Sequence, residues 1–397
     1  MRVIPAAKLL PLRLSALLLS LSPAAAFAVD VVSLVELPAP DFAGTAGVSN
    51  VTADGTVVGT AWPNATAVRW KPGQAAEDLG GDTFTLENVM PLVSADGSVI
   101  VAGNYFPPAN PEDPNALPIS KPGIWRGGTT WEPIGGTVLA SSTPYGIADN
   151  GAHLAGSGIL TTPAPGGPPL YEKAWKWSAA TGQVVLPGVP GLQHTQAWAV
   201  SNDGTVAAGF GDNEPDNRAR YAVIWTAEGV RKLVDASGRP VGQAIACNSD
   251  CSIVVGAGDT GGTGSPQAWR WTAQGGVQFL GTAPGAQDGA VYYAFDLTED
   301  GSTIVGSYPE LDPEQGYMNR GFIWTAQTGV VNVVDFLADR GIDFGQGYYD
   351  LVVNSMSRDG RFLLINAMDA DYQRHRALVR IDGDAIFADG FEAQPGG

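Results

Sequence analysis

The stretch AWAVSNDGTVAAG, residues 197–209, decides the fold of this chain. Two short apolar runs flank Asp203-Gly204, and Asp-Gly is the preferred centre of a two-residue type I′ hairpin turn, in which both central residues have positive φ. After a variable connection come the run YAVIW (221–225), the tight turn TAEG (226–229) and the run VRKLV (230–234). These runs and turns together predict a four-stranded antiparallel meander.

The same unit occurs seven times. The turn glycines are Gly55, Gly97, Gly151, Gly204, Gly301 and Gly360, with Cys251 in the fifth position; the third strand ends in Trp70, Trp125, Trp177, Trp225, Trp271 and Trp324, and in Val379 in the last unit. Successive turns are 42 to 59 residues apart. Four-stranded units of this length are typical of the blades of a β-propeller and are too long for the coils of a β-helix. Period-two patterning with 52 Gly and 29 Pro excludes a helical solenoid.

The two ends of the repeat region complement each other. Residues 31–37 precede the first unit and resemble a fourth strand that has no blade, whereas the last unit offers only three strands, at 351–355, 361–365 and 377–381. We therefore expect the N-terminal strand to complete the last blade, because such closure removes exposed sheet edges. The prediction is an all-β, seven-bladed β-propeller of four-stranded antiparallel blades over residues 29–381. The six Trp of the repeat are expected in the core, each burying roughly 150–250 Å².

Residues 1–28 have the layout of a secretory signal peptide. Arg2, Lys8 and Arg13 precede an apolar run at 14–21, and Ala26-Phe27-Ala28 forms a cleavage site. The rival interpretation is an uncleaved anchor, but Arg13 and Pro23 leave an apolar run too short to span a bilayer. The sequence predicts export to the periplasm or the extracellular space. Residues 382–397 form a C-terminal tail that is either a sorting tag or an ordered strand end.

The charge of the chain limits its partners. Removal of the three basic leader residues from the 22 Lys and Arg leaves 19 against 40 Asp and Glu, so the net charge changes from −18 to about −21. Such an anion repels nucleic acid and anionic lipid headgroups. We expect a monomer without nucleic-acid partners, membrane span or cofactor. The charge favours cationic partners or divalent ions, or serves solubility alone.

The two cysteines fit an oxidising compartment. Cys247 and Cys251 lie on opposite sides of the fifth hairpin turn, within reach of a disulfide. A redox or metal site would need more ligands or a neighbouring base, and the chain has three His. The prediction is a structural disulfide that contributes about 2 kcal/mol by the chain-entropy estimate.

With its units aligned, the chain resembles the HAF-repeat extracellular proteins of bacteria. The matching stretches are SADGSVIV (94–101), TEDGSTIVG (298–306) and GFIW (321–324), and the resemblance extends over about residues 31–381. The His-Ala-Phe triplet that names the family is absent, with Ala-Val, Ala-Trp or Gly-Phe in its place. The resemblance implies export and a propeller-like repeat, and it brings no catalytic residues.

Turn lengths predict where a function would lie. The turns between first and second and between third and fourth strands are short, whereas the other connections are long, variable and at the opposite face. Loops on a rigid scaffold carry function, so we expect a glycan, peptide or protein to bind at that face. The candidate residues combine apolar bodies with polar tips: Tyr105, Tyr145, His194, Trp198, Tyr293, Tyr349 and Asp350. The alternative interpretation is that the aromatics only cover blade ends and fix loops.

Two further hypotheses concern metal and catalysis. The loop with Asp212 and Asp216 could bind Ca²⁺ weakly, although it lacks the ordered spacing of a calcium loop. The alternative function is a hydrolase or lyase of an extracellular polymer, using carboxylates such as Asp296 and Asp350 with His194. No nucleophile elbow, zinc-protease motif or phosphate loop supports catalysis.

Overall fold

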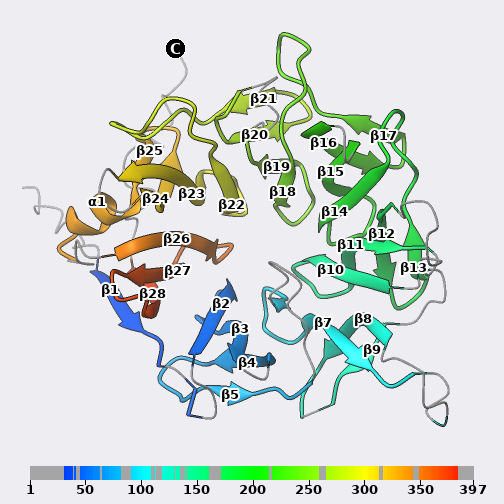
Figure 1. Cartoon of the computed structure of the whole chain (residues 1–397), viewed down its shortest axis with the longest axis horizontal. Coiled ribbons are helices and arrows are strands. Elements are labelled where there is room, and N and C mark those ends of the chain that lie inside the picture. The colour runs from blue at the N-terminus through cyan, green and yellow to red at the C-terminus, as the bar shows by residue number, and fades with distance from the viewer. Residues whose placement is uncertain are drawn as a thin grey trace, which may run out of the picture.

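The computed structural model is a ring of seven four-stranded antiparallel sheets that radiate from a common centre (Figure 1). It describes residues 31–382 except 39, 42–44, 63–64, 82–90, 109–111, 113–118, 129, 135–138, 140, 161–170, 214–216, 259–264, 313–315 and 343–347. The predicted signal peptide and most of the predicted tail lie outside the described residues. The predicted seven-bladed propeller is confirmed.

Each blade runs from an inner to an outer strand. Blade 1 contains β2 (Thr45–Val51), β3 (Val57–Trp62), β4 (Thr66–Trp70) and β5 (Glu77–Asp78). Blade 2 contains β6 (Leu92–Val93), β7 (Ile100–Phe106), β8 (Ile119–Trp125) and β9 (Glu132–Pro133). Blade 3 contains β10 (Ser141–Ile147), β11 (His153–Ile159), β12 (Lys173–Ser178) and β13 (Gly182–Val185). Blade 4 contains β14 (His194–Val200), β15 (Ala207–Asn213), β16 (Asn217–Thr226) and β17 (Gly229–Lys232). Blade 5 contains β18 (Ala244–Cys247), β19 (Ile253–Gly256), β20 (Trp269–Thr272) and β21 (Gly276–Phe279). Blade 6 contains β22 (Tyr293–Leu297), β23 (Thr303–Asp312), β24 (Gly316–Thr325) and β25 (Gly329–Asn332), and helix α1 (Val333–Ala338) follows it.

Blade 7 closes the ring. It contains β26 (Tyr348–Met356), β27 (Phe362–Asp369) and β28 (Arg374–Asp382), and its outer strand is the N-terminal β1 (Val31–Glu36). Strand β1 is antiparallel to β28 over six residue pairs, from Val31 opposite Asp382 to Glu36 opposite Ala377. The chain therefore begins and ends its described part in one sheet, as predicted.

Among the described residues, the hydrophobic core consists of seven clusters, each shared by two neighbouring blades. All six Trp of the repeat are buried in these clusters, with exposures between 1% and 8%, which confirms their predicted packing role. Arginines of one blade lie over the Trp ring of the next: Arg69 is 4.6 Å from the centroid of Trp125 and Arg231 is 5.3 Å from that of Trp271. Blade-to-blade burial therefore holds the ring together.

The prediction of type I′ turns was wrong. In blade 4 the Gly204 N–H donates to the Ser201 carbonyl at 2.9 Å, and Asp203 does not have positive φ. This is a type I turn followed by a left-handed residue, with φ +68° at Gly204. The cause is the Asp203 carboxylate, which accepts from the Ser201 hydroxyl and the Thr205 N–H. These bonds lower the pKa of Asp203 to about 2, and keep it in the turn as a permanent acceptor.

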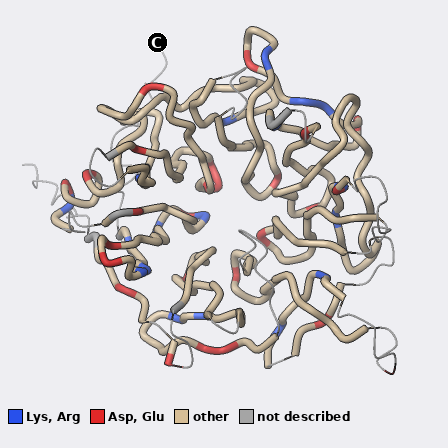
Figure 2. The backbone as a smooth tube through the Cα atoms, viewed as in Figure 1, with Lys and Arg blue, Asp and Glu red and all other residues tan. Residues whose placement is uncertain are grey.

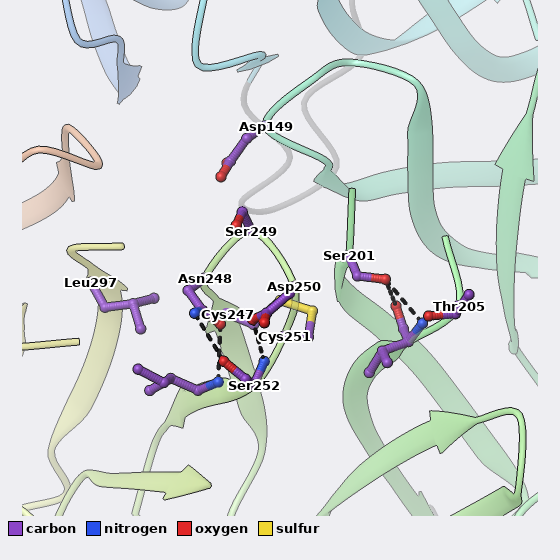
Figure 3. The surroundings of a disulfide bond; sticks show 12 residues. Asp149, Ser201, Thr205, Cys247, Asn248, Ser249, Asp250, Cys251, Ser252 and Leu297 are labelled. Atoms are coloured by element: carbon purple, nitrogen blue, oxygen red, sulfur yellow. Dashed lines mark hydrogen bonds between the residues drawn. A yellow bond between two sulfur atoms is a disulfide. The ribbon is translucent and has the colours of Figure 1, made fainter. Parts of the chain in front are cut away.

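The predicted disulfide between Cys247 and Cys251 is present (Figure 3). Cys251 has φ +52° and occupies the position of the turn glycine. Both residues are 3% exposed and belong to the cluster between blades 4 and 5. The bond crosses one hairpin turn and therefore acts as a local structural link.

Two of the connections between second and third strands, which the sequence predicts as long and variable, are largely strand. Strands β15 and β16 extend into 211–220, and β23 and β24 extend into 308–319, where loops were expected. Pro309 is tolerated because β22 pairs with β23 only as far as Ser307, so β23 is an edge strand at Pro309. We call the end of the ring with the first-to-second and third-to-fourth strand turns the short-turn face, and the opposite end the long-connection face.

His375 links the closing strand to blade 7. Its Nδ1 lies 3.0 Å from Glu36 Oε1 and its Nε2 lies 2.9 Å from Asp369 Oδ2. Both nitrogens can donate only when the imidazole is protonated. The bond to Asp369, and then Glu36, raises the pKa of His375 above its ordinary value of 6.5.

We expect this linkage to make stability pH-dependent. A raised folded pKa gives stability that is fully present below the unfolded pKa and lost as pH rises through the folded pKa. Urea midpoints of the wild type should therefore fall more between pH 6 and pH 8.5 than those of His375→Gln. The difference should be about 1 kcal/mol or less, since the pair is partly open to solvent. His153→Asn is the control, because burial lowers the pKa of His153 and its contribution has the opposite sign. Parallel curves for wild type and His375→Gln would contradict the linkage.

Candidate functional site

Two surface hollows lie at the long-connection face. The larger, of about 390 Å³, is formed by the connection between β21 and β22 and by the β23–β24 hairpin; the smaller, of about 160 Å³, lies between blades 6 and 7. Both are bordered by segments that precede first strands or join second to third strands. Both of these hollows therefore lie at the face where the turn lengths predict a ligand.

Tyr145 and Trp198 form a stacked aromatic pair on neighbouring inner strands. Their ring centroids are 5.1 Å apart and their planes differ by 1°. Each ring is at a β-bulge, because the register shifts between Pro144 and Gly146 and between Ala197 and Ala199. A bulge leaves its extra residue unpaired and re-aims its side chain. The two predicted residues are thus brought together by a shared irregularity.

A polar network adjoins this aromatic pair. Trp198 Nε1 donates to Gln196 Oε1 at 2.9 Å, and Gln196 Nε2 donates to Glu172 Oε2 at 2.5 Å. The Ser157 hydroxyl donates to the same carboxylate oxygen at 3.1 Å. Burial, and then the charge of Glu172, raises the pKa of Tyr145 to about 12. The Tyr145 hydroxyl therefore remains protonated and neutral at physiological pH.

The network continues toward blade 5 through Arg220. Its guanidinium lies 4.5 Å from the ring centroid of Phe210, and its Nη1 donates to Gln243 Oε1 at 2.5 Å. Phe210 in turn is 6.2 Å from Trp198. Aromatic faces, a carboxylate, amides and a guanidinium thus lie in one continuous region of blades 3 to 5.

The larger hollow, which we call the blade-6 hollow, contains the predicted residue Tyr293. It is lined by Gln287, Asp288, Gly289, Ala290, Val291, Tyr293, Pro309, Tyr317 and Asn319. The Asn319 N–H donates to Asp350 Oδ1 at 2.8 Å. The predicted Asp350 therefore lies beside this hollow and joins the inner strand of blade 7 to the hairpin of blade 6.

Sequence reasoning missed several residues of these regions. Gln196 had a usable signal, because residues two apart share a strand face and Gln196 precedes Trp198 by two. Tyr317 lies in a segment that was expected to be a loop, and Glu172 directly precedes β12. Their partners depend on how the connections fold, which no local pattern indicates.

Of the remaining predicted residues, His194 lies beside the polar network, because the N–H of the next residue, Thr195, donates to the Glu172 carbonyl at 3.1 Å. The ring of His194 contacts that of Tyr171 edge-on, with centroids 4.9 Å apart. Tyr105 is 40% exposed at the end of β7. The side chain of Tyr349 lies outside the described residues, whereas its neighbour Tyr348 lines the smaller hollow and contacts His375.

The metal and catalytic hypotheses gain no support. Asp216 lies outside the described residues, and within the described part of the chain no group of three or more His, Cys, Asp or Glu could hold a metal ion. Asp296 accepts from Ser355 Oγ at 2.9 Å and from Arg358 at 3.1 Å, whereas Asp350 accepts from Asn319. These carboxylates therefore have separate partners. The described segments contain no helix with the length and apolarity to cross a bilayer.

Comparison with known proteins shows the fold alone. No family model and no curated protein matches this sequence. Among solved structures, a chain from a study of two prolyl endopeptidases has a TM-score of 0.50 at 12% identity, with 90% of this chain and 51% of that chain covered. An oligogalacturonate lyase in complex with manganese has a TM-score of 0.49 at 12% identity, over 89% of this chain and 98% of that one. TolB from Acinetobacter baumannii has a TM-score of 0.40 at 11% identity over 84% of this chain, and this chain spans 64% of its length.

Proposed function

We propose that this chain is an exported propeller, as its resemblance to HAF-repeat proteins implies, and that it is non-catalytic and recognises an extracellular glycan, peptide or protein through its long-connection face. The stacked pair of Tyr145 and Trp198 is the observation that carries this proposal. The pair lies within the inner strands, and its bonded residues Gln196 and Glu172 link it to the long-connection face, because Glu172 directly precedes β12. A ligand would find an apolar surface beside oriented donors and acceptors, which is the usual composition of a recognition site.

Two further features support binding rather than chemistry. The carboxylates that could act as acid and base have separate structural partners. The blade scaffold is held by buried Trp and by inter-blade clusters, so substitutions on the inner strands would act on a rigid frame. Preorganised groups on such a frame bind with little ordering cost.

Glycan and peptide arrays probed with residues 29–397 test this proposal. Trp198→Ala should weaken the strongest interaction at least about tenfold, since central aromatic residues dominate binding energy at interfaces. Trp198→Phe keeps a ring but loses the bond to Gln196 and should have a smaller effect. Val184→Ala, on outer strand β13 with 41% exposure, is the matched control and should change nothing. Folding of each variant is checked by near-ultraviolet circular dichroism. Equal binding by wild type and both Trp198 variants would refute the proposed site.

A further inference from the structure

The blade-6 hollow has the composition of a site for one positively charged side chain. Tyr293, Tyr317, Pro309 and Val291 supply apolar and aromatic surface, while Asp288 is its charged lining residue. Its volume of about 390 Å³ is at the lower end of the range for small-ligand pockets. The hollow is therefore suited to a single side chain or a group of similar size.

Electrostatics around the hollow favour a cation. Asp288 lines it, and Asp350 is bonded to the backbone of its lining residue Asn319. The nearby Arg320 is engaged elsewhere: its Nε donates to Glu310 Oε2 at 2.5 Å and its Nη1 donates to the Tyr348 carbonyl at 3.2 Å. Glu310 also alternates with Pro309 and Leu311 along β23, so this ion pair belongs to the other face of the hairpin.

The rim of the hollow is exposed and apolar. Tyr317 is 70% exposed and Leu311 is 46% exposed, and they face each other across the β23–β24 hairpin. On the opposite face of the same hairpin, Tyr308 and Met318 are each 4% exposed. The hairpin, which extends from blade 6 in Figure 1, is thus anchored on one face and presents Leu311 and Tyr317 on the other. Exposed Tyr beside an aliphatic side chain is typical of a protein-binding surface.

We infer that the blade-6 hollow binds an Arg or Lys side chain of a peptide or protein partner. This inference rests on the proposed function and names a partner class for one part of the same face. The cation lies against Tyr317 and Tyr293 and pairs with Asp288, while residues that flank it on the partner contact Leu311. Attraction of a cation to aromatic faces and a carboxylate accounts for the choice of ligand. The strongly negative chain also attracts basic partners over long range.

The test measures binding of fluorescein-labelled Gly/Ser octapeptides with central Arg-Arg, Lys-Lys, Gln-Gln or Glu-Glu to residues 29–397 by fluorescence anisotropy. The Arg and Lys peptides should bind and the Gln and Glu peptides should not. Tyr317→Ala should weaken binding of the Arg peptide about fivefold to tenfold, and Asp288→Asn should weaken it and flatten its salt dependence. Glu228→Gln, an exposed charge in the β16–β17 turn of the short-turn face, is the matched control and should bind like wild type.

Three outcomes would overturn the inference: equal binding of the Gln and Arg peptides, unchanged binding after both Tyr317→Ala and Asp288→Asn, or equal weakening by Glu228→Gln and Asp288→Asn. If a neutral hexasaccharide displaced the Arg peptide, and if this displacement depended on Tyr317 but not on salt concentration, the ligand of the hollow would be a glycan and not a basic peptide. The two proposals can fail separately. If only the cation site in the blade-6 hollow is wrong, array binding that depends on Trp198 remains; if the proposed function is wrong, that array binding is absent.

Discussion

Deletion of residues 31–36 is expected to abolish cooperative folding of this protein. Strand β1 supplies the outer strand of blade 7, and Leu34 packs against the cluster between blades 6 and 7. Its loss exposes the edge of β28 and removes Glu36, which forms a hydrogen bond with His375. Since a whole domain is stabilised by only about 5–15 kcal/mol, loss of a complete strand should remove most of that free energy. Urea unfolding followed by Trp fluorescence measures the effect.

A circular permutant separates loss of the strand from loss of its position in the chain. Residues 31–37 are moved behind Asp382 through an Asn-Gly turn, which fits because Val31 and Asp382 are paired neighbours in antiparallel strands. The permutant should unfold cooperatively with a midpoint close to that of wild type. A deletion variant as stable as wild type would show that β1 does not close the ring.

Replacement of Arg358 by Met should cost about 3 kcal/mol of unfolding free energy. Arg358 lies in the β26–β27 turn and donates to Asp149 of blade 3 at 3.0 Å and to Asp296 of blade 6 at 3.1 Å. Figure 2 shows the basic stretch at the inner end of β26 beside an acidic stretch of the β22–β23 turn. The three side chains are between 13% and 25% exposed, so removal of the guanidinium leaves two carboxylates poorly solvated.

The control for Arg358 is Arg361→Met in the same hairpin. Arg361 pairs with Asp359 at 2.5 Å, but its side chain is 53% exposed, so its loss should cost about 1 kcal/mol or less. Addition of Asp149→Asn and Asp296→Asn to Arg358→Met should restore part of the stability, because the unpaired charges are removed. Equal costs for Arg358→Met and Arg361→Met would contradict a special role for the central ion pairs.

The ring could be predicted from the sequence because its information is repeated. Seven turns at similar spacing, six Trp in one position, and a spare N-terminal strand that matches the strand missing from the last unit each point to the same closed sheet. These features are local in sequence and are set by alternation and burial. Closure by residues 31–37 required only a count of strands.

Details of the turns and connections could not be predicted in the same way. The Asp-Gly pair is typical of a type I′ turn, but the Ser201 hydroxyl donates to the Asp203 carboxylate, and this bond favours a type I turn instead. Residues 308–312 and 316–319 include Pro309 and acidic residues, yet they pair as two strands because Tyr308 and Met318 are buried on one face of the hairpin. Tertiary burial therefore decided where local propensity was ambiguous.

The candidate site was predictable as a face and as residue types, but only in part as an arrangement. Tyr145 and Trp198 occupy equivalent positions in successive units, so their proximity follows from the repeat. Tyr317 and Glu172 come from connections whose length differs in every blade, and their positions depend on contacts that only the folded ring provides. Function in such a scaffold is encoded where the units differ.

Hydrogen exchange of residues 29–397, with and without the tightest ligand found on the arrays, tests most directly whether the long-connection face binds. We expect slower exchange at 171–173, 192–198, 286–293 and 308–320, with no change in the turns at 53–55, 202–204 and 358–360. Protection confined to those short turns, or to the outer strands, would contradict binding at the long-connection face.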